Sequence, residues 1–413
     1  MIKIVMLSTG EEVLHGDIVD TNAAWLSEYF YQQGLPLARR STVGDHMDTL
    51  IEELVTLSFN NDVVIVNGGL GPTTDDMSAE AMAAAAEVGL ELNTQWLDRL
   101  KQFFAARGKE MPKSNIKQAM LPVGAEMIDN PVGTACGFKV RLNDCDLYFT
   151  PGVPSEFKKM ITEAICPRIK AGVPTLTPMR CSRLYTFGST ESGLSDRLAK
   201  FDLPEGYEFG YRSAIPFIEV KLLGPADDIE VRVKLMQMVY KLIAEFVVSI
   251  DETMIEHIGH LLADKKLNLS IAEESTFGHL SYWVNSDEKA SAQMGSAWVL
   301  GSDKPNFNHE QDPVAAALAL AGASKDRCKS DVAVVTGALD NQTFAIAVAT
   351  EQGEWGQLLS FNRRYNTENS KVVISTLAMD MLRRILSAAS VFPEYASVTR
   401  SKEIFIPASM IES

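Results

Sequence analysis

The sequence contains few of the features that mark several other classes of protein. It has 5 cysteines in 413 residues, widely spaced and without a Cys-x-x-Cys pair. An odd number of scattered cysteines does not make a disulfide framework, so we expect reduced, packed thiols. They are Cys136, Cys145, Cys166, Cys181 and Cys328.

Positive charge and long apolar runs are also scarce. Lys and Arg total 38 against 54 Asp and Glu, giving a formal net charge of -16. Because phosphate backbones are held mainly by Lys and Arg, this balance argues against nucleic acid as a partner. No apolar run reaches membrane-spanning length, and Met1 leads almost directly into a strand-like run, so we expect no signal peptide. We therefore expect a cytoplasmic protein without a membrane partner.

Length and patterning instead predict a globular chain of several domains. A chain of 413 residues is too long for one ordinary core. Pro167, Gly172, Pro174 and Pro178 cluster after the first region and predict a boundary. We expect a first domain at 1–170, a small α/β domain at 171–250 and a third α/β domain at 251–413.

Alternating strand-like and helix-like runs predict an α/β fold with a mainly parallel sheet covered by helices. In the first region the predicted strands are Ile2 to Leu7 and Asp62 to Val66, and the predicted helices are Ala23 to Gln33, Leu50 to Ser58 and Ser78 to Val88. Farther along, the strands are Leu184 to Phe187, Phe217 to Leu223, Leu269 to Ala272, Ala297 to Leu300, Asp331 to Thr336 and Thr343 to Ala349, and the helices are Glu191 to Phe201, Ile229 to Val247, Pro313 to Ala323 and Ser370 to Ala389.

The segment Val64 to Asp76 joins a strand to a glycine-rich loop that ends in two carboxylates. Gly68, Gly69 and Gly71 would let the backbone approach an anion near a helix start. A bare phosphate would be repelled by Asp75 and Asp76, whereas a divalent cation can take carboxylate and phosphate oxygens together. The segment therefore indicates a nucleotide diphosphate bound with its metal. The competing interpretation is that Thr74 or Asp75 merely caps the helix.

A second acidic loop, Ser8 to Asn22, follows the first predicted strand. It carries Glu11, Asp17 and Asp20 as candidates for metal ligation, ribose contacts or activation of water, and Thr21 or Asn22 would cap the next helix. Loops at the carboxyl ends of neighbouring parallel strands meet at one edge of the sheet, which favours a shared site over a solvated acidic loop. His15 and His46 have no partners that would make a histidine-rich site.

Two weaker segments, Asn130 to Phe138 and Leu147 to Phe157, look like additional loops around the same sheet. They can supply backbone N–H groups, the Thr134 hydroxyl and one carboxylate. Structural turns are the favoured explanation of each segment.

These loops resemble the CinA family, whose first domain is related to the MogA and MoaB molybdopterin-binding proteins. The matching text is "TGEEVLHGDIVDTNAAWL", "NGGLGPTTDD", "QAMLP", "NPVGTACGF", "TPGVPSEF" and, in the middle region, "FGSTESGLSDRL". The resemblance implies a MogA/MoaB-like three-layer sandwich followed by a small α/β domain and a C-terminal CinA-type α/β domain. It also implies hydrolysis of ADP-ribose to AMP and ribose 5-phosphate by a homodimer that uses Mg²⁺, Mn²⁺ or Co²⁺, with K⁺ as an optional stimulating ion.

On this basis we assign roles to the residues of the loops. Asp75, Asp76, Glu11 and Asp20 are the candidate catalytic residues, with Asp75 and Asp76 as the metal ligands. The candidate phosphate- and nucleotide-binding residues are Gly10, Thr21, Asn22, Gly68, Gly69, Gly71, Thr73, Thr74, Gly133, Thr134, Pro151 and Gly152. Two alternatives stay open: binding or adenylylation of a molybdopterin-like cofactor, and a non-catalytic nucleotide-binding regulator.

The C-terminal region departs from the resembled family at its catalytic run. Active nicotinamide mononucleotide amidases of this type carry a run close to Ala-Glu-Ser-Cys-Thr-Gly-Gly, and Ala272 to Gly278 puts Glu274 at the place of the nucleophilic serine. Ser275 is one place away, and a shift of one residue turns a strand side chain to the opposite face. Gly301, Ser302 and Lys304 are out of step, and Thr336 to Asn341 replaces a glycine-proline loop. We therefore expect an inactive amidase relative with a role in oligomerisation or ligand sensing.

Overall fold

The computed structural model describes residues 2–301 and 312–411, and their contacts divide the chain into two compact units. The first unit comprises Met1–Arg180 with Pro225–Asp227, and the second comprises Cys181–Gly224 with Asp228–Ser413. The middle and C-terminal regions thus share one unit, and the division into three domains stays a prediction. No helix among the described residues is long and apolar enough to cross a membrane.

The first unit is a six-stranded sheet in the order β2-β1-β3-β8-β7-β6. The pairs β2-β1, β1-β3 and β3-β8 are parallel, whereas β7 pairs antiparallel with β8 and β6. The strands are β1 (Ile4–Thr9), β2 (Leu37–Val43), β3 (Val63–Asn67), β6 (Glu126–Ile128), β7 (Gly137–Leu142) and β8 (Cys145–Thr150), with a separate pair β4 (Leu90–Leu92) and β5 (Met120–Pro122). The prediction of loops at Asn130 to Phe138 and Leu147 to Phe157 was therefore wrong in part, because these segments contribute to β7 and β8.

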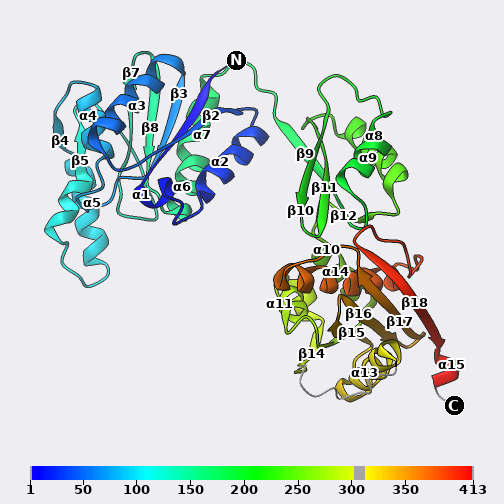
Figure 1. Ribbon diagram of the computed structural model, residues 1–413. Helices are drawn as coiled ribbons and strands as arrows, with labels where there is room; N and C mark the ends of the chain where they lie inside the picture. Colours follow the sequence, from blue (N-terminus) through cyan, green and yellow to red (C-terminus); the bar gives the residue numbers. More distant parts are fainter. Residues whose placement is uncertain (1, 302–311, 412–413) are drawn as a thin grey trace. The chain divides into compact units, whose positions relative to one another are not determined.

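Helices cover both faces of this sheet (Figure 1). Side chains alternate along β1, so that Ile4 and Met6 pack with one helical layer while Val5 and Leu7 pack with the other. One layer contains α2 (Thr21–Gln32), α6 (Pro154–Met160), η2 (Ile161–Ile165) and α7 (Cys166–Ala171), and the other contains α3 (Met47–Asn60), α4 (Ser78–Ala85) and α5 (Thr94–Ala105). This three-layer arrangement confirms the predicted α/β class.

The second unit contains two sheets. The smaller sheet, β10-β11-β9-β12, packs against two helices, and the larger sheet has the order β14-β13-β15-β16-β17-β18. The elements of the smaller sheet are β9 (Met179–Thr186), α8 (Glu191–Leu198), β10 (Glu208–Ala214), β11 (Phe217–Pro225), α9 (Ile229–Ile243) and β12 (Val247–Ile250). The helix predicted to reach Val247 ends at Ile243, because the chain turns there into β12.

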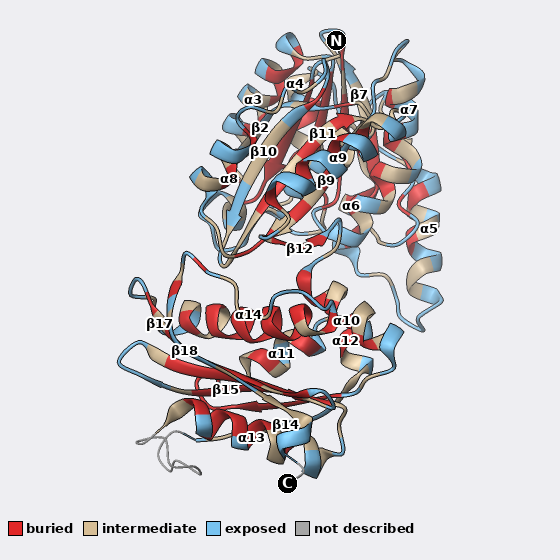
Figure 2. Ribbon diagram, turned by 90° about the vertical axis from the view of Figure 1, so that its right-hand side faces the viewer, coloured by how far each residue is buried: buried red, intermediate tan, exposed pale blue. Residues whose placement is uncertain are grey.

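The larger sheet is also enclosed between helices, and the buried colouring of Figure 2 marks most of α14 and the central strands of the sheet. Its α13 packs on one face, and α10, α11 and α14 pack on the other. The elements are α10 (Met254–Lys265), β13 (Leu269–Glu273), α11 (His279–Asn285), α12 (Glu288–Ala292), β14 (Met294–Val299), α13 (Pro313–Cys328), β15 (Val332–Asp340), β16 (Thr343–Thr350), β17 (Gly353–Phe361), α14 (Thr367–Leu386), β18 (Val398–Pro407) and α15 (Ala408–Ile411).

A buried ionic cluster on α14 connects the two sheets of the second unit. Asp380 pairs with Arg383 and Arg384 at 2.7 Å, and Tyr395 donates to Asp380 at 2.8 Å. Arg384 also donates to the carbonyl oxygen of Glu245, which lies just before β12. Burial alone would raise the pKa of Asp380, but the two guanidinium groups and their hydrogen bonds outweigh it and the pKa is lowered. The carboxylate therefore stays ionised inside the core.

Candidate functional site

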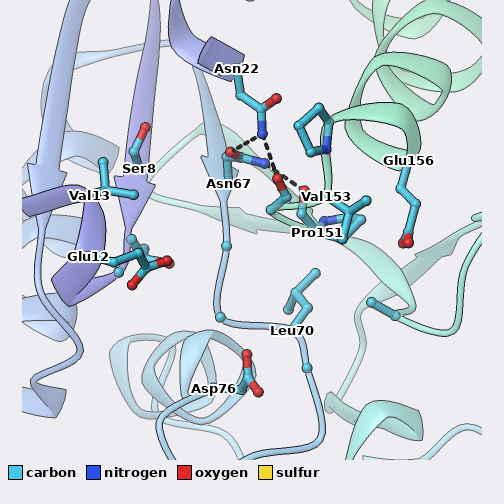
Figure 3. Close-up of a pocket in the computed structure, with 18 of the residues that line it drawn as sticks. Ser8, Glu12, Val13, Asn22, Asn67, Leu70, Asp76, Pro151, Val153 and Glu156 are labelled. Carbon is cyan, nitrogen blue, oxygen red and sulfur yellow. Dashed lines mark hydrogen bonds between the residues drawn. The ribbon is translucent and has the colours of Figure 1, made fainter. Parts of the chain in front are cut away.

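A pocket of about 500 Å³ opens at the carboxyl ends of β1, β3 and β8 (Figure 3). This is the edge at which open parallel sheets bind ligands. The lining residues come from segments far apart in the sequence: Ser8, Thr9, Gly10, Glu12, Val13, Ile18, Val19, Asp20, Thr21, Asn22, Asp45, Asn67, Gly68, Gly69, Leu70, Gly71, Pro72, Asp75, Asp76, Gln118, Thr134, Ala135, Pro151, Gly152, Val153, Pro154 and Glu156.

Glycine is required where the loop after β3 passes the end of β1. Gly68 has φ +118°, and a Cβ atom there would lie 2.5 Å from the Thr9 hydroxyl oxygen. Gly69 has φ +67°, and its Cβ would collide with the Ser78 hydroxyl. Since only glycine allows this conformation and this approach, the loop can lie against the strand ends and α4.

Two asparagine amides fasten the loops around the pocket to each other, as the dashed lines of Figure 3 show. Asn67 donates to the Pro151 carbonyl at 2.7 Å and accepts from Asn22 at 3.0 Å. Asn22 donates in addition to the Gly152 carbonyl at 2.8 Å. Because both amides are buried and the carbonyls can only accept, the orientation of the two side chains is fixed.

The carboxylate of Asp76 is held by its own loop. Thr73 donates to Asp76 from its backbone N–H at 2.9 Å and from its hydroxyl. Lys117, in the 3-10 helix η1 (Lys113–Ala119), donates to the Thr73 carbonyl at 2.9 Å and pairs with Glu80 at 3.2 Å. The loop therefore presents Asp76 in one defined orientation.

Asp75 lies at the exposed end of the same loop. Its pKa is lowered, first by hydrogen bonding from Thr73, then by its backbone N–H and by the charge of Lys117. The helix α4 starts at Ser78 with Met77 as N-cap and without a side-chain cap. The competing interpretation of Thr74 or Asp75 as a helix cap is therefore wrong, and Asp75 is an ionised group beside the pocket.

The pocket wall is rich in acid and contains no Lys, Arg or His among its described lining residues. Its six carboxylates are Glu12, Asp20, Asp45, Asp75, Asp76 and Glu156. The pKa of Asp45 is raised, first by burial and then by the negative charge of the neighbouring carboxylates Glu12, Asp75 and Glu11. A phosphate entering such a pocket without a cation would be repelled.

Most of the predicted site residues line this pocket, but four do not. Glu11, Thr73, Thr74 and Gly133 are absent from the lining. Glu11 instead accepts from the Asp45 backbone N–H at 3.0 Å and lies 3.3 Å from His46 and 3.4 Å from His15. Within the short helix α1 (Glu11–Leu14), Glu12 and Val13 line the pocket, and Glu12 is the acidic one. The acid of α1 in the pocket wall is therefore Glu12, one residue after the predicted Glu11.

Asp20 has a different local role from the one expected. It caps α2, since its carboxylate accepts from the Ala23 backbone N–H at 2.8 Å and from Ser8 at 2.6 Å. The prediction of Thr21 or Asn22 as the cap was wrong. Asp20 still lines the pocket, but both of its oxygens accept hydrogen bonds, whereas Asp45 accepts one, from the Glu11 backbone N–H at 3.3 Å.

Sequence reasoning did not assign Glu12, Asp45 or Glu156 to the site. Glu156 accepts from Asn130 at 2.7 Å. Asp45 follows β2, a strand that was not predicted because its centre carries the polar run Arg39 to Thr42 instead of an apolar pattern. Treating the Gly44-Asp45 pair as a strand end would have brought Asp45 into the site.

The donor atoms suit a hard cation, which prefers carboxylate oxygens. In residues 2–301 and 312–411 no group of three His, Cys, Asp or Glu side chains has the geometry of a metal site. Mg²⁺ usually keeps several waters and binds one or two carboxylates together with substrate phosphates, so a pair such as Asp75 and Asp76 fits this ion. Asp75 and Asp76 could hold the cation together with the phosphates of the ligand, rather than before the ligand binds.

A second pocket, of about 840 Å³, lies in the larger sheet of the second unit. Glu273, at the end of β13, is fully buried and accepts from the Thr276 hydroxyl at 2.6 Å and from three backbone N–H groups at 2.9–3.0 Å around the start of α11. Glu274 and Ser275 follow it and line the pocket. Gly301 lines it too, whereas Ser302 and Lys304 lie outside the described residues.

Comparison with known proteins agrees with the resemblance of the loops. Residues 5–171 match the family described as probable molybdopterin binding domain. The chain is 41% identical over 397 residues to a CinA-like protein of Escherichia coli O17:K52:H18, covering 96% of each. It is also 41% identical over 397 residues to the NMN amidohydrolase-like protein YfaY of Escherichia coli K12, covering 96% of this chain and 97% of that protein.

Solved structures match individual parts of the chain. The protein CinA from Thermoplasma acidophilum, described as having unknown function, is 29% identical and covers 40% of this chain and 97% of its own, with a TM-score of 0.38. MoaB from Thermus thermophilus is 17% identical and covers 42% and 94%, with a TM-score of 0.29. By its similarity along almost its whole length, the chain belongs to the CinA-like protein family and contains a MogA/MoaB-like domain.

Proposed function

We propose that the pocket of the first unit hydrolyses the pyrophosphate of ADP-ribose to AMP and ribose 5-phosphate. The observation that carries the proposal is the wall of six carboxylates with no basic side chain among the described lining residues, next to a glycine loop. A pyrophosphate can enter such a pocket only with cations that neutralise it. The same composition does not suit a free phosphate or an anionic peptide.

In this proposal each part of the pocket has one task. The glycine loop brings backbone N–H groups to the phosphate oxygens. Asp75 and Asp76 would hold a divalent cation, which supplies polarisation of the phosphorus and a more acidic bound water. Glu12 or Asp45 accepts the proton of the attacking water, and the Asn22 and Asn67 amides hold the surrounding loops in place.

The test is to incubate the purified full chain with ADP-ribose and Mg²⁺, Mn²⁺ or Co²⁺, with and without K⁺, and to measure AMP and ribose 5-phosphate by chromatography. We expect turnover that EDTA abolishes and that Asp75→Ala and Asp76→Ala reduce. Asp17→Ala is the matched control, because Asp17 belongs to the acidic loop but does not line the pocket. Full activity in both pocket variants would contradict the site.

Binding of a molybdopterin-like cofactor is the second candidate, and the family match over residues 5–171 favours it. A pterin that stays bound through purification, detected by its fluorescence, together with absence of ADP-ribose cleavage, would replace the first proposal by this one. Adenylylation of such a ligand would appear as pyrophosphate release from ATP. The homodimer stays a prediction that molecular mass in solution can test.

For the C-terminal region we propose that amide hydrolysis is lost. The relative named NMN amidohydrolase-like protein suggests nicotinamide mononucleotide as the substrate to test. Glu274 stands where a nucleophile is needed, and a carboxylate there would repel the anionic tetrahedral intermediate. Ammonia release from nicotinamide mononucleotide by the full chain would contradict this proposal directly.

A further inference from the structure

One lysine contacts the loop of the first pocket from outside the pocket wall. Lys117, in η1, donates to the Thr73 carbonyl at 2.9 Å and pairs at 3.2 Å with Glu80, in the first turn of α4. It lines a small adjoining cavity together with Glu80 and Asp76, but it is absent from the described lining of the first pocket. Lys117 therefore acts on a ligand of the first pocket through its charge and through the loop, without touching the ligand.

The ammonium group of Lys117 is close enough to the acids of the loop to influence them. Thr73, which accepts from Lys117, also donates from its backbone N–H to Asp76 at 2.9 Å. The pKa of Asp75 is lowered first by hydrogen bonding from Thr73, and the charge of Lys117 lowers it further. The Lys117 side chain is 28% exposed, so water and salt screen its charge less than that of a lysine on the open surface.

A positive charge at this position has opposite effects on a cation and on a nucleotide. A divalent cation that approaches Asp75 and Asp76 alone is repelled by Lys117, whereas a pyrophosphate is attracted. The six carboxylates of the pocket wall have the reverse effect, because they attract the cation and repel the pyrophosphate. Lys117 therefore offsets part of the effect of the pocket acids, and its partner Glu80 reduces that offset.

We propose that Lys117 makes the first pocket bind a divalent cation together with a nucleotide diphosphate rather than alone. Its charge weakens the binding of the free cation and strengthens the binding of the anionic nucleotide that follows. Lys117 is a positioning residue, because it acts through the loop and not on the reacting atoms. The inference rests on the proposed function for the choice of ADP-ribose as the nucleotide, but it does not require that ADP-ribose is cleaved.

Two binding constants of the full chain test this proposal without turnover. Electron paramagnetic resonance measures the binding of Mn²⁺ alone, and calorimetry at saturating Mn²⁺ measures the binding of α,β-methylene ADP-ribose, whose bridge cannot be hydrolysed. Lys117→Gln keeps a donor for the Thr73 carbonyl but removes the charge. We expect this variant to bind Mn²⁺ about threefold more tightly and the analogue about threefold more weakly, which is the range for one partly screened charge.

Matched variants distinguish the effect of charge from damage to the loop. Glu80→Gln removes the negative partner of Lys117 and should shift both constants in the opposite direction. Lys117→Arg keeps the charge, and Lys113→Gln alters an exposed lysine of the same helix, so both should bind like the unaltered chain. Thermal unfolding checks that each variant is folded.

The two constants also separate this inference from the proposed hydrolysis. The inference is overturned if Lys117→Gln weakens the binding of both ligands, if it changes neither constant, or if Mn²⁺ does not improve binding of the analogue to the unaltered chain. If the unaltered chain binds Mn²⁺ and the analogue but leaves ADP-ribose intact, the proposed hydrolysis is wrong. The opposite shifts in Lys117→Gln would still support the role of Lys117.

Discussion

The two pockets occupy equivalent places in two α/β sheets but carry opposite charge. Each lies where parallel strands end and helices begin, at β1 and β3 in the first unit and at β13 and β15 in the second. The first has six carboxylates and no basic group among its described lining residues, whereas the second combines Glu274 with Arg364 and Lys371. The shared architecture determines where a ligand can sit, and the side chains determine whether it must bring a cation.

The largest expected effect comes from removing charge in the first pocket. Asp76→Asn keeps the size and one acceptor of the side chain but loses the charge that would hold a cation. We expect ADP-ribose hydrolysis to fall about 10²-fold or more, in the range typical of essential catalytic groups. Steady-state rates at saturating metal measure it. Full activity of the variant would break the contrast between the two pockets.

The buried cluster of α14 should affect only the second unit. Asp380→Asn leaves Arg383 and Arg384 without their counter-charge, and breaking a buried pair in this way costs about 3–5 kcal/mol. We expect a lower melting transition for the second unit in calorimetry and unchanged hydrolysis in the first. Because the pKa of Asp380 is lowered on folding, its contribution is present above about pH 4 and is lost as the pH falls through the folded pKa. The variant should therefore lose stability less steeply in acid.

The adjacent residues Glu11 and Glu12 test which acid belongs to the first pocket. Glu12→Gln should lower hydrolysis about tenfold or more, because Glu12 is one of two candidate acceptors of the water's proton and Asp45 is the other. Glu11→Gln should change activity much less, because Glu11 binds the Asp45 backbone outside the pocket wall. Comparing the initial rates of the two variants shows which of the two acids contributes to hydrolysis. A larger loss in Glu11→Gln would restore the original sequence-based assignment.

The smallest expected effect concerns the stability that is lost by placing Asp45 among other carboxylates. The raised pKa of Asp45 means that folding disfavours its ionised form, so the carboxylate reduces stability at pH values above that pKa. Asp45→Asn should stabilise the first unit by about 0.5 kcal/mol at neutral pH and by less in acid. Thermal unfolding at two pH values tests the sign. Destabilisation at neutral pH would show that Asp45 contributes favourable contacts instead.

Much of the fold followed from local patterns, and the residues that were missed show the limits of that approach. The strand Val63–Asn67 and the helix Ser78–Ala85 have strong apolar or alanine-rich signals, and both lie close to their predicted positions. Glu12 was missed because the choice between two adjacent acids depends on the orientation of a four-residue helix. Glu156 was noted only as the one carboxylate of a weak loop and was given no role, because its partner Asn130 lies 26 residues away and only the assembled sheet brings the two together.

The amide link between Asn22 and Asn67 has a consequence for evolution and engineering of this protein. It connects the first turn of α2, which follows the loop after β1, to the end of β3 and, through Pro151 and Gly152, to the loop after β8. Substitutions in the three loops should therefore be epistatic, with combined effects that differ from the sum of the single ones. A change of ligand specificity would require coordinated replacement of the three loops rather than stepwise exchange.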